Sequence, residues 1–228
     1  MTDGADFVLV RWPQALAGAL SRATGTDVVT AITTSEPVVA LTFDDGPHPA
    51  TTPHLLDVLA AAGARATFFV LGSLADRHPQ LIERIAGEGH ELGNHLMHDE
   101  PSIRLHPADF ERQLAQVHAL LTPHGPVRFF RPGSGWFSPR LLRAGAALGY
   151  RCALGSPGLI AAFYPNPDAV GLRLARRARP GAVLVLHEGT DRRSDVTRVT
   201  KRLLTELTRR GLTATTLSDL SGRGRERG

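Results

Sequence analysis

Short apolar segments alternate with amphipathic ones along most of the chain. Residues 38–43, VVALTF, form an apolar run rich in β-branched residues, which predicts a buried strand. Residues 54–63 carry apolar residues at helical spacing and end in a glycine, which predicts a helix. The alternation continues, with strands expected at 66–72, 90–94, 127–133, 150–155, 182–188 and 212–217, and helices at 79–89, 106–121, 138–149, 168–178 and 195–210.

This order of elements predicts an α/β fold. About seven parallel strands alternating with helices suit either a closed, distorted βα barrel or a doubly wound sheet. Residues 1–36 have weak periodicity, and we expect them to form a lead-in segment that packs on the domain formed by residues 37–220. The Gly- and Arg-rich residues 221–228 are expected to form a disordered basic tail.

The composition excludes several classes of protein. The chain of 228 residues is 42% hydrophobic and 21% charged, as in ordinary globular domains. Its net charge of +4 does not indicate nucleic-acid binding, because the 26 basic residues are nearly balanced by 22 acidic ones. No basic stripe carries interleaved aromatic residues either. No segment has the pattern of a secretory signal or of a membrane span, so we expect a cytoplasmic protein with no membrane partner.

Polar residues follow the ends of several predicted strands. In both candidate architectures the carboxyl ends of the strands form the ligand-binding face. The residues at these ends are Asp44, Asp45, His95, Arg131, His187 and Glu188. We therefore expect their side chains to converge on one rim.

The adjacent carboxylates of Asp44 and Asp45 repel each other, so their pairing needs an explanation. A rigid turn would point them in different directions, and one could then bind a divalent cation while the other handles a proton. The sequence DDGP also suits a type I turn, so a purely structural role stays open.

Residues 89–102, GHELGNHLMHDEPS, offer further metal ligands. His95 and Asp99 stand four residues apart and His95 and His98 three apart, so either pair can share a helix face. A carboxylate with one or two imidazoles is an ordinary ligand set for zinc or a similar ion. A polar loop with incidental histidines is the alternative.

Two more segments add candidate groups. In FFRPGSGWF, residues 129–137, a strand ends in a Gly-rich loop whose N–H groups could stabilise an oxyanion, and Trp136 offers a flat face to a sugar ring. His187 emerges from an apolar strand, as expected for a general acid or base, although a lone histidine there is more often structural. Together the segments suit attack of a metal-activated water on an amide carbonyl.

Four motifs resemble those of the NodB-homology polysaccharide deacetylases, carbohydrate esterase family 4. They are TFDDGP (42–47), GNHLMHDE (93–100), RPGSGWF (131–137) and LVLHE (184–188), and the resemblance extends from about Val38 to Leu220. It implies a distorted βα barrel of the NodB type and metal-dependent removal of an acetyl group from an N-acetylated amino sugar.

The resemblance also implies a role for individual residues. Asp44 would be the general base, oriented by Arg131, and His187 the general acid. Asp45 and His95 would bind a divalent metal ion, with zinc favoured over cobalt, nickel or manganese.

Substrate contacts are implied as well. The backbone N–H near Ser134 would donate to the oxyanion, and Trp136 would contact the sugar.

The chain departs from the family pattern at two positions. Where the family has its second metal histidine, this chain has Asp99; we favour Asp99 as third ligand because the spacing is kept, with His98 as the alternative. The family's Asp-Trp motif, whose carboxylate supports the catalytic histidine, has no clear match in residues 155–168, where Asp168 is the only acid.

The substrate prediction rests on the aromatic content. With only two Trp and two Tyr, the chain is poorly equipped to stack several sugar rings, which favours a small acetylated glycoside over a long polymer. Two alternatives stay open: a hydrolase of a non-sugar amide or cyclic imide, and a non-catalytic carbohydrate-binding descendant. The oligomeric state is not predicted.

Overall fold

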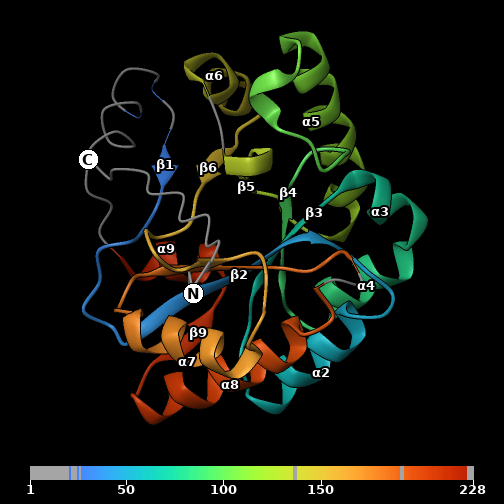
Figure 1. Ribbon diagram of the computed structural model, residues 1–228. Helices are drawn as coiled ribbons and strands as arrows, with labels where there is room; N and C mark the ends of the chain where they lie inside the picture. The colour runs from blue at the N-terminus through green and yellow to red at the C-terminus, as the bar shows by residue number, and fades with distance from the viewer. Residues whose placement is uncertain (1–20, 22–24, 26, 136–137, 191–192, 225–228) are drawn as a thin grey trace, which may run out of the picture.

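A curled parallel sheet occupies the centre of the molecule, and most helices lie on its outer face (Figure 1). The computed structural model describes residues 21, 25, 27–135, 138–190 and 193–224. Within these residues nine strands pair in the order β1-β6-β5-β4-β3-β2-β8-β7, with β9 beside β2, and every ladder is parallel. The structure thus confirms the predicted α/β class and the curled, barrel-like sheet.

Strands and helices alternate as the apolar pattern predicts. The strands are β1 Val28–Val29, β2 Val38–Gly46, β3 Thr67–Val70, β4 Glu91–Asn94, β5 Phe129–Phe130, β6 Arg151–Ala153, β7 Ile160–Ala161, β8 Val183–His187 and β9 Thr213–Thr215. The helices are α2 Thr52–Ala61, α3 Gly72–Arg77, α4 Pro79–Gly87, α5 Pro107–Leu121, α6 Pro139–Ala147, α7 Pro167–Arg177, α8 Val196–Arg209 and α9 Leu217–Arg223, with 3-10 turns at Ser102–Arg104, Thr122–His124 and Gly133–Gly135. Proline in the first turn helps to start several of these helices, because its fixed φ suits that position.

Four elements were not expected. β1 and β7 have two residues each and α3 has six, so they are too short to show a period. α9 includes residues 221–223, so the prediction of a disordered tail is wrong for these three residues. They are helical because Leu217 and Leu220 are buried and Arg223 pairs with Glu36 at 2.9 Å.

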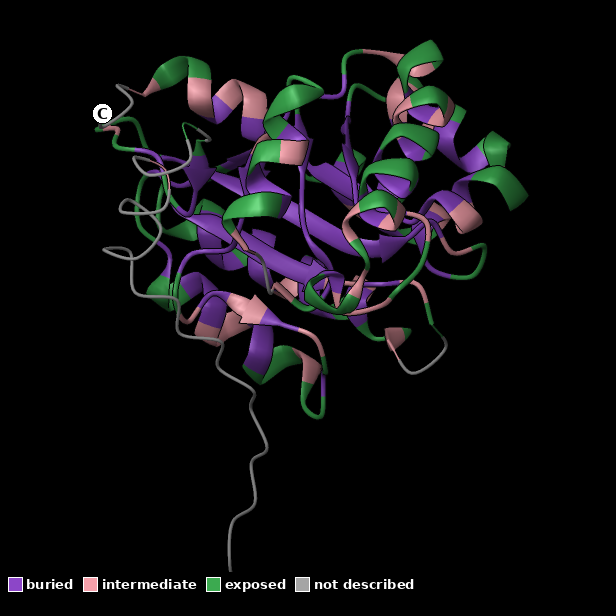
Figure 2. Cartoon of the chain, turned by 90° about the horizontal axis from the view of Figure 1, so that it is seen from above, coloured by how far each residue is buried: buried purple, intermediate pink, exposed green. Residues whose placement is uncertain are grey.

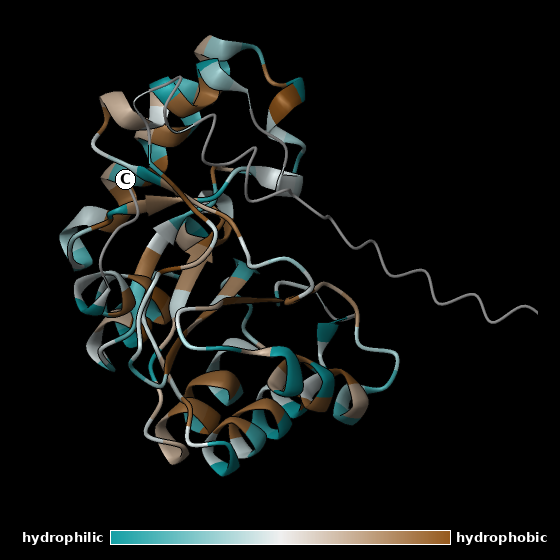
Figure 3. Ribbon diagram, turned by 90° about the vertical axis from the view of Figure 1, so that its left-hand side faces the viewer, coloured by the Kyte–Doolittle hydropathy of each residue, from teal (hydrophilic) through white to brown (hydrophobic). Residues whose placement is uncertain are grey.

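The sheet is buried on both faces, as the continuous apolar runs require. Along β2, Val39, Leu41 and Phe43 pack in the outer core beneath the helices, whereas Val38 and Ala40 belong to a separate cluster inside the curl. Figure 2 shows the strands buried between helices whose outer faces are exposed, and Figure 3 shows apolar helix faces directed toward the sheet.

α9 covers the end of the curl at which the strands begin. Its Leu217 and Leu220 join Phe69 and Phe129 in the inner cluster. The Leu217 N–H donates to Thr67 Oγ1 at 2.9 Å, and the Ser218 N–H donates to Glu91 Oε2 at 3.1 Å. Because Thr67 and Glu91 are the first residues of β3 and β4, these bonds fix the helix to the amino end of the sheet.

Ser156 ties the two sides of the curled sheet together. Its backbone N–H donates to the Val183 carbonyl of β8 at 2.9 Å, and its hydroxyl accepts from the Val183 N–H at 2.9 Å. The same hydroxyl donates to the Thr30 carbonyl, just after β1, at 2.7 Å. The curl therefore closes through Ser156, together with the isolated bridge between Ala31 and Ala182, rather than through a regular strand ladder. No helix of the described ranges is long and apolar enough to cross a membrane.

We expect Ser156→Ala to lower the free energy of unfolding by about 2 kcal/mol, because it leaves the Val183 N–H and the Thr30 carbonyl buried without a partner. Urea denaturation followed by circular dichroism measures this. Ser221→Ala is the matched control: its hydroxyl is buried without a partner, so its removal should change the same quantity by less than about 0.5 kcal/mol. Equal losses in the two variants would contradict the role given to Ser156.

Candidate active site

Asp44 and Asp45 line the same cavity because β2 is irregular at its end. Successive residues of a regular strand point to opposite faces, but the register with β3 shifts between Asp44 and Gly46, and Asp45 has φ of 69°. Both side chains therefore reach the cavity, although each residue is no more than 5% exposed. The segment is the end of a strand and not the start of a type I turn.

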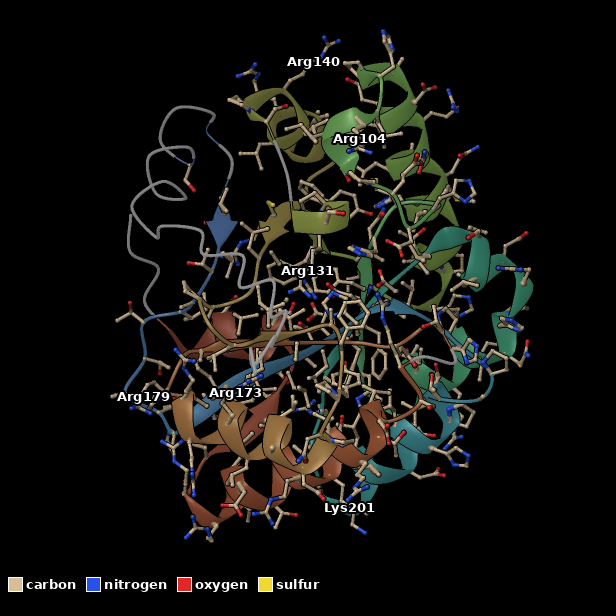
Figure 4. All side chains as sticks on the ribbon, viewed as in Figure 1. Arg104, Arg131, Arg140, Arg173, Arg179 and Lys201 are labelled. Atoms are coloured by element: carbon tan, nitrogen blue, oxygen red, sulfur yellow. The ribbon has the colours of Figure 1, made fainter. Side chains whose placement is uncertain are left out.

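Arg131 forms an ion pair with Asp44 inside the curl. Its Nη1 lies 2.5 Å from Asp44 Oδ1 and 2.9 Å from Thr42 Oγ1, and its Nε donates to the Ala153 carbonyl at 2.9 Å. The guanidinium lies over the Phe69 ring, 4.0 Å from its centroid. In Figure 4, Arg131 lies near the centre of the molecule, among the strands. These contacts orient both the arginine and the carboxylate that faces it.

Asp45 has different partners. His95 Nε2 lies 3.1 Å from Asp45 Oδ1, and His95 Nδ1 donates to the Arg131 carbonyl at 2.8 Å. Burial alone would raise the pKa of Asp45, but the hydrogen bond from His95 and the charges of His95, His187 and Arg193 hold it below its usual range. Burial would lower the pKa of His95, whereas the hydrogen bond to Asp45 and the charges of Asp44 and Asp45 raise it overall. Asp45 is therefore ionised near neutral pH.

Arg193 is a site residue that the sequence did not reveal. Its Nη1 pairs with Asp45 Oδ2 and donates to the Glu188 carbonyl at 2.9 Å. It stands in the loop between β8 and α8, and its side chain is 13% exposed. Position after a strand was the only available signal, and it does not separate Arg193 from the other charged residues of that loop.

His187 lines the same cavity and lies beside Asp44. Its Nε2 is 3.7 Å from Asp44 Oδ2, and its Nδ1 is 3.0 Å from the Ala161 carbonyl of β7. Because a carbonyl only accepts, Nδ1 carries a proton and Nε2 faces Asp44. Asp168 does not orient this ring: it pairs with Arg198 at 2.5 Å on the surface.

A cavity of about 310 Å³ connects these groups. Asp44, Asp45, His95, Arg131, His187 and Arg193 line it together with apolar residues such as Leu154, Ile160 and Val185. Ser134, with φ of 57°, and Gly135 also line it, whereas the Gly133 N–H is already bonded to Ser102 Oγ at 2.7 Å. Trp136, the predicted sugar contact, lies outside the described residues.

Two of the predicted metal ligands fit a divalent ion, and the third is not assembled. Asp45 Oδ1 and His95 Nε2 face each other at 3.1 Å, as two ligands of one ion would. Both Asp99 and His98 are exposed, but only Asp99 lines the same cavity. Among the described residues no group of three or more His, Cys, Asp or Glu side chains is close enough to hold an ion, so the choice of Asp99 over His98 stays a prediction.

Glu188 is a buried acid next to the cavity. Its Oε2 accepts from Thr51 Oγ1 at 3.0 Å and from Thr52 Oγ1 at 2.7 Å, whereas its Oε1 has no partner. Burial raises the pKa of Glu188 to about 7, with a further contribution from the charge of Asp45, although the threonine hydroxyls oppose it. The unpartnered Oε1 is consistent with a carboxyl group that keeps its proton below neutral pH.

A curled parallel βα sheet with acid–base groups at the carboxyl ends of its strands is typical of a barrel-type enzyme site. The model of the polysaccharide deacetylase family matches residues 31–153, more than half of the chain. The chain belongs to this family, as the sequence motifs predicted. Members of this family are generally metal-dependent.

Curated relatives cover most of the chain. A peptidoglycan-N-acetylglucosamine deacetylase of Bacillus cereus is 30% identical over 190 residues, which is 82% of this chain and 89% of the relative. A chitooligosaccharide deacetylase of Sinorhizobium fredii is 37% identical over 159 residues, which is 68% of this chain and 74% of the relative.

Solved structures agree on the fold. A peptidoglycan N-acetylglucosamine deacetylase superposes with a TM-score of 0.81 at 23% identity, covering 91% of this chain and 98% of that one. Bacillus subtilis PdaA, a family 4 carbohydrate esterase, superposes with a TM-score of 0.76 at 27% identity, covering 92% and 89%.

We expect Glu188→Gln to stabilise the protein relative to the wild type increasingly as the pH rises from about 5 to 8. The pKa of Glu188 is about 7 in the folded state, whereas an ordinary glutamate, as in the unfolded chain, has a pKa of 4.5. Between these pH values the folded state holds a proton that the unfolded state has released. The free energy of unfolding of the wild type therefore falls as pH rises through this window, by about 3 kcal/mol at most. The side-chain amide of the Glu188→Gln variant does not titrate, so the variant does not lose this stability.

Urea denaturation of the chelator-treated proteins at several pH values measures the difference. Glu83→Gln, at an exposed position of α4, is the control and should show no such pH dependence. The assignment is wrong if Glu188→Gln differs from the wild type by the same amount at pH 5 and pH 8.

Proposed function

We propose that this chain is a metal-dependent hydrolase that removes the acetyl group from an N-acetylated amino sugar. The observation that carries the proposal is the separation of the two adjacent carboxylates: Asp44 pairs with Arg131, and Asp45 pairs with His95. One carboxylate is thereby available for proton transfer and the other for a cation. The relatives named as peptidoglycan and chitooligosaccharide deacetylases support this assignment.

Asp44 is the general base of the proposed reaction. Arg131, itself bonded to Thr42, donates to Oδ1 of Asp44, so Oδ2 is left to accept the proton of the attacking water. The ion pair with Arg131 offsets the cost of burying the Asp44 carboxylate, which would be high for an unpaired charge.

His187 is the general acid. Its Nε2 lies 3.7 Å from Asp44 Oδ2, so acid and base lie side by side and both can reach one amide bound in the cavity. When protonated, Nε2 can donate to the leaving amine. A divalent ion held by Asp45 and His95, with Asp99 as third ligand and zinc favoured, would supply a Lewis acid for the acetyl carbonyl and the attacking water.

The cavity suits a small substrate. Its volume of about 310 Å³ is near the lower limit of ligand pockets, which run from ~300 to ~1,000 Å³. Apolar wall residues such as Leu154 and Val185 suit the acetyl methyl group, and the charged groups suit the reacting amide. We propose that the site binds one acetylated sugar unit and that further units contribute little.

A non-catalytic carbohydrate-binding role is the second candidate. The observation that favours it is the unassembled third ligand: at the position of the family's second metal histidine stands Asp99, and the described residues contain no three-ligand group. Such a protein would bind sugar without metal and release no acetate.

We expect metal-stripped protein resupplied with zinc, cobalt, nickel or manganese to release acetate from N-acetylated mono- and oligosaccharides. Asp44→Asn should lower kcat by about 10²- to 10⁴-fold, because it removes the general base. Asp168→Asn, which removes an exposed carboxylate paired with Arg198, is the matched control and should retain full activity.

The substrate panel separates the alternatives. Little gain in kcat/KM with oligosaccharide length supports the small-substrate proposal, and a steep gain overturns it. Turnover of a cyclic imide alone would reassign the protein to a different amide, and sugar binding without turnover under any metal would leave the non-catalytic role.

We expect Asp99→Ala to weaken zinc binding at least about 10-fold and His98→Ala to change it less than about twofold. Loss of one ligand from a set of three removes a direct metal bond, whereas His98 does not line the cavity. Isothermal titration of the metal-stripped variants with zinc gives the two affinities. The opposite order would make His98 the third ligand.

A further inference from the structure

Tyr164 is a buried residue beside the catalytic histidine that no sequence motif indicated. Its hydroxyl accepts a hydrogen bond from the His187 backbone N–H at 2.7 Å and lies 2.7 Å from the His187 carbonyl. It is also 3.3 Å from the Ala161 carbonyl. Burial raises the pKa of Tyr164, so the phenol stays protonated. A phenol has one proton, and the shorter distance assigns it to the His187 carbonyl.

The hydroxyl stands where a strand would otherwise pair with β8. β7 pairs with β8 at Ile160–Val185 and Ala161–Leu186, and then the chain leaves the sheet. His187 is the next residue of β8, and its backbone N–H and carbonyl would be left without partners on that side. The Tyr164 hydroxyl satisfies both of them with one oxygen.

Because the Tyr164 hydroxyl takes the place of a strand partner, the Ala161 carbonyl can accept from the histidine ring. His187 Nδ1 donates to that carbonyl at 3.0 Å. The Val185 N–H donates to the Leu159 carbonyl at 3.0 Å, so a regular parallel ladder would continue from the His187 N–H to the Ala161 carbonyl. Without the phenol oxygen, the His187 N–H would have this carbonyl as its acceptor. Backbone and ring would then compete for it, and the ring would lose its fixed orientation.

We propose that Tyr164 is a positioning residue that fixes the tautomer of His187, together with the Ala161 carbonyl, in place of a carboxylate. The acid nearest to Tyr164 in sequence, Asp168, pairs with Arg198 on the surface and cannot serve. A ring held with its proton on Nδ1 presents Nε2 to the cavity, where Asp44 Oδ2 lies 3.7 Å away. A neutral carbonyl sets this tautomer without adding a negative charge beside the site.

The proposal can be tested in protein labelled with ¹⁵N at its histidine rings. A long-range proton–nitrogen spectrum reports which ring nitrogen carries the proton, and His187→Gln identifies the His187 signals. In the wild type we expect the form protonated at Nδ1. In Tyr164→Phe, which removes only the hydroxyl, we expect a mixture of the two neutral tautomers.

Kinetics provide the second readout, and this arm rests on the proposed function. Tyr164→Phe should lower kcat for acetate release about 10-fold and leave KM within about twofold, because the ring is misoriented while the cavity is intact. Tyr150→Phe is the matched control: this buried tyrosine also has two hydrogen-bond partners, His118 Nδ1 at 2.7 Å and Asn94 Nδ2 at 3.1 Å, but does not contact His187. It should leave the His187 signals unchanged and kcat within about twofold.

The outcomes separate the two proposals. An unchanged tautomer and an unchanged kcat in Tyr164→Phe overturn the role of Tyr164. A changed tautomer in a protein whose wild type releases no acetate supports the positioning role and removes the proposed function instead. If Tyr164→Phe does not fold, the wild-type spectrum decides, because a His187 protonated at Nε2 contradicts the arrangement.

Discussion

The burial of two neighbouring carboxylates at the end of one strand is the constraint on which the rest of the site depends. A buried charge is costly unless it is paired and hydrogen-bonded, and two adjacent charges of the same sign need separate partners. Asp44 and Asp45 obtain theirs from different places: Arg131 after β5, and His95 after β4 with Arg193 after β8. The carboxyl ends of these strands must therefore meet at one point, which the curl of the sheet achieves.

The position of Arg131 depends on residues well away from the two carboxylates. The guanidinium is held by Thr42, by the Ala153 carbonyl and by the face of Phe69, which itself belongs to the inner cluster closed by α9. Gly93 is needed opposite this ring, because a Cβ at that position would lie 2.6 Å from Phe69. Apolar packing at one end of the curl thus sets the geometry of a proton-transfer group at the other.

Much of this could be predicted from the sequence, because the strands have clear apolar runs and ligands collect at the carboxyl ends of parallel strands. That rule placed Asp44, Asp45, His95, Arg131 and His187 on one rim, and the structure brings them together around one cavity. The bulge that turns Asp44 and Asp45 to the same side left no periodic signal, because it involves a single residue. The orientation of His187 could not be predicted either, since a backbone carbonyl such as that of Ala161 has no sequence signature, and Tyr164 acts through its hydroxyl on the main chain.

The packing of α9 decides which end of the curl carries the site. Leu217, Leu220, Phe69 and Phe129 fill the end at which the strands begin. The cavity lined by Asp44, Asp45 and His187 lies at the other end, where the strands finish. The loops that follow the strands, such as the one that carries Arg193, therefore stand between the reacting groups and solvent, and their sequences determine which molecules reach those groups.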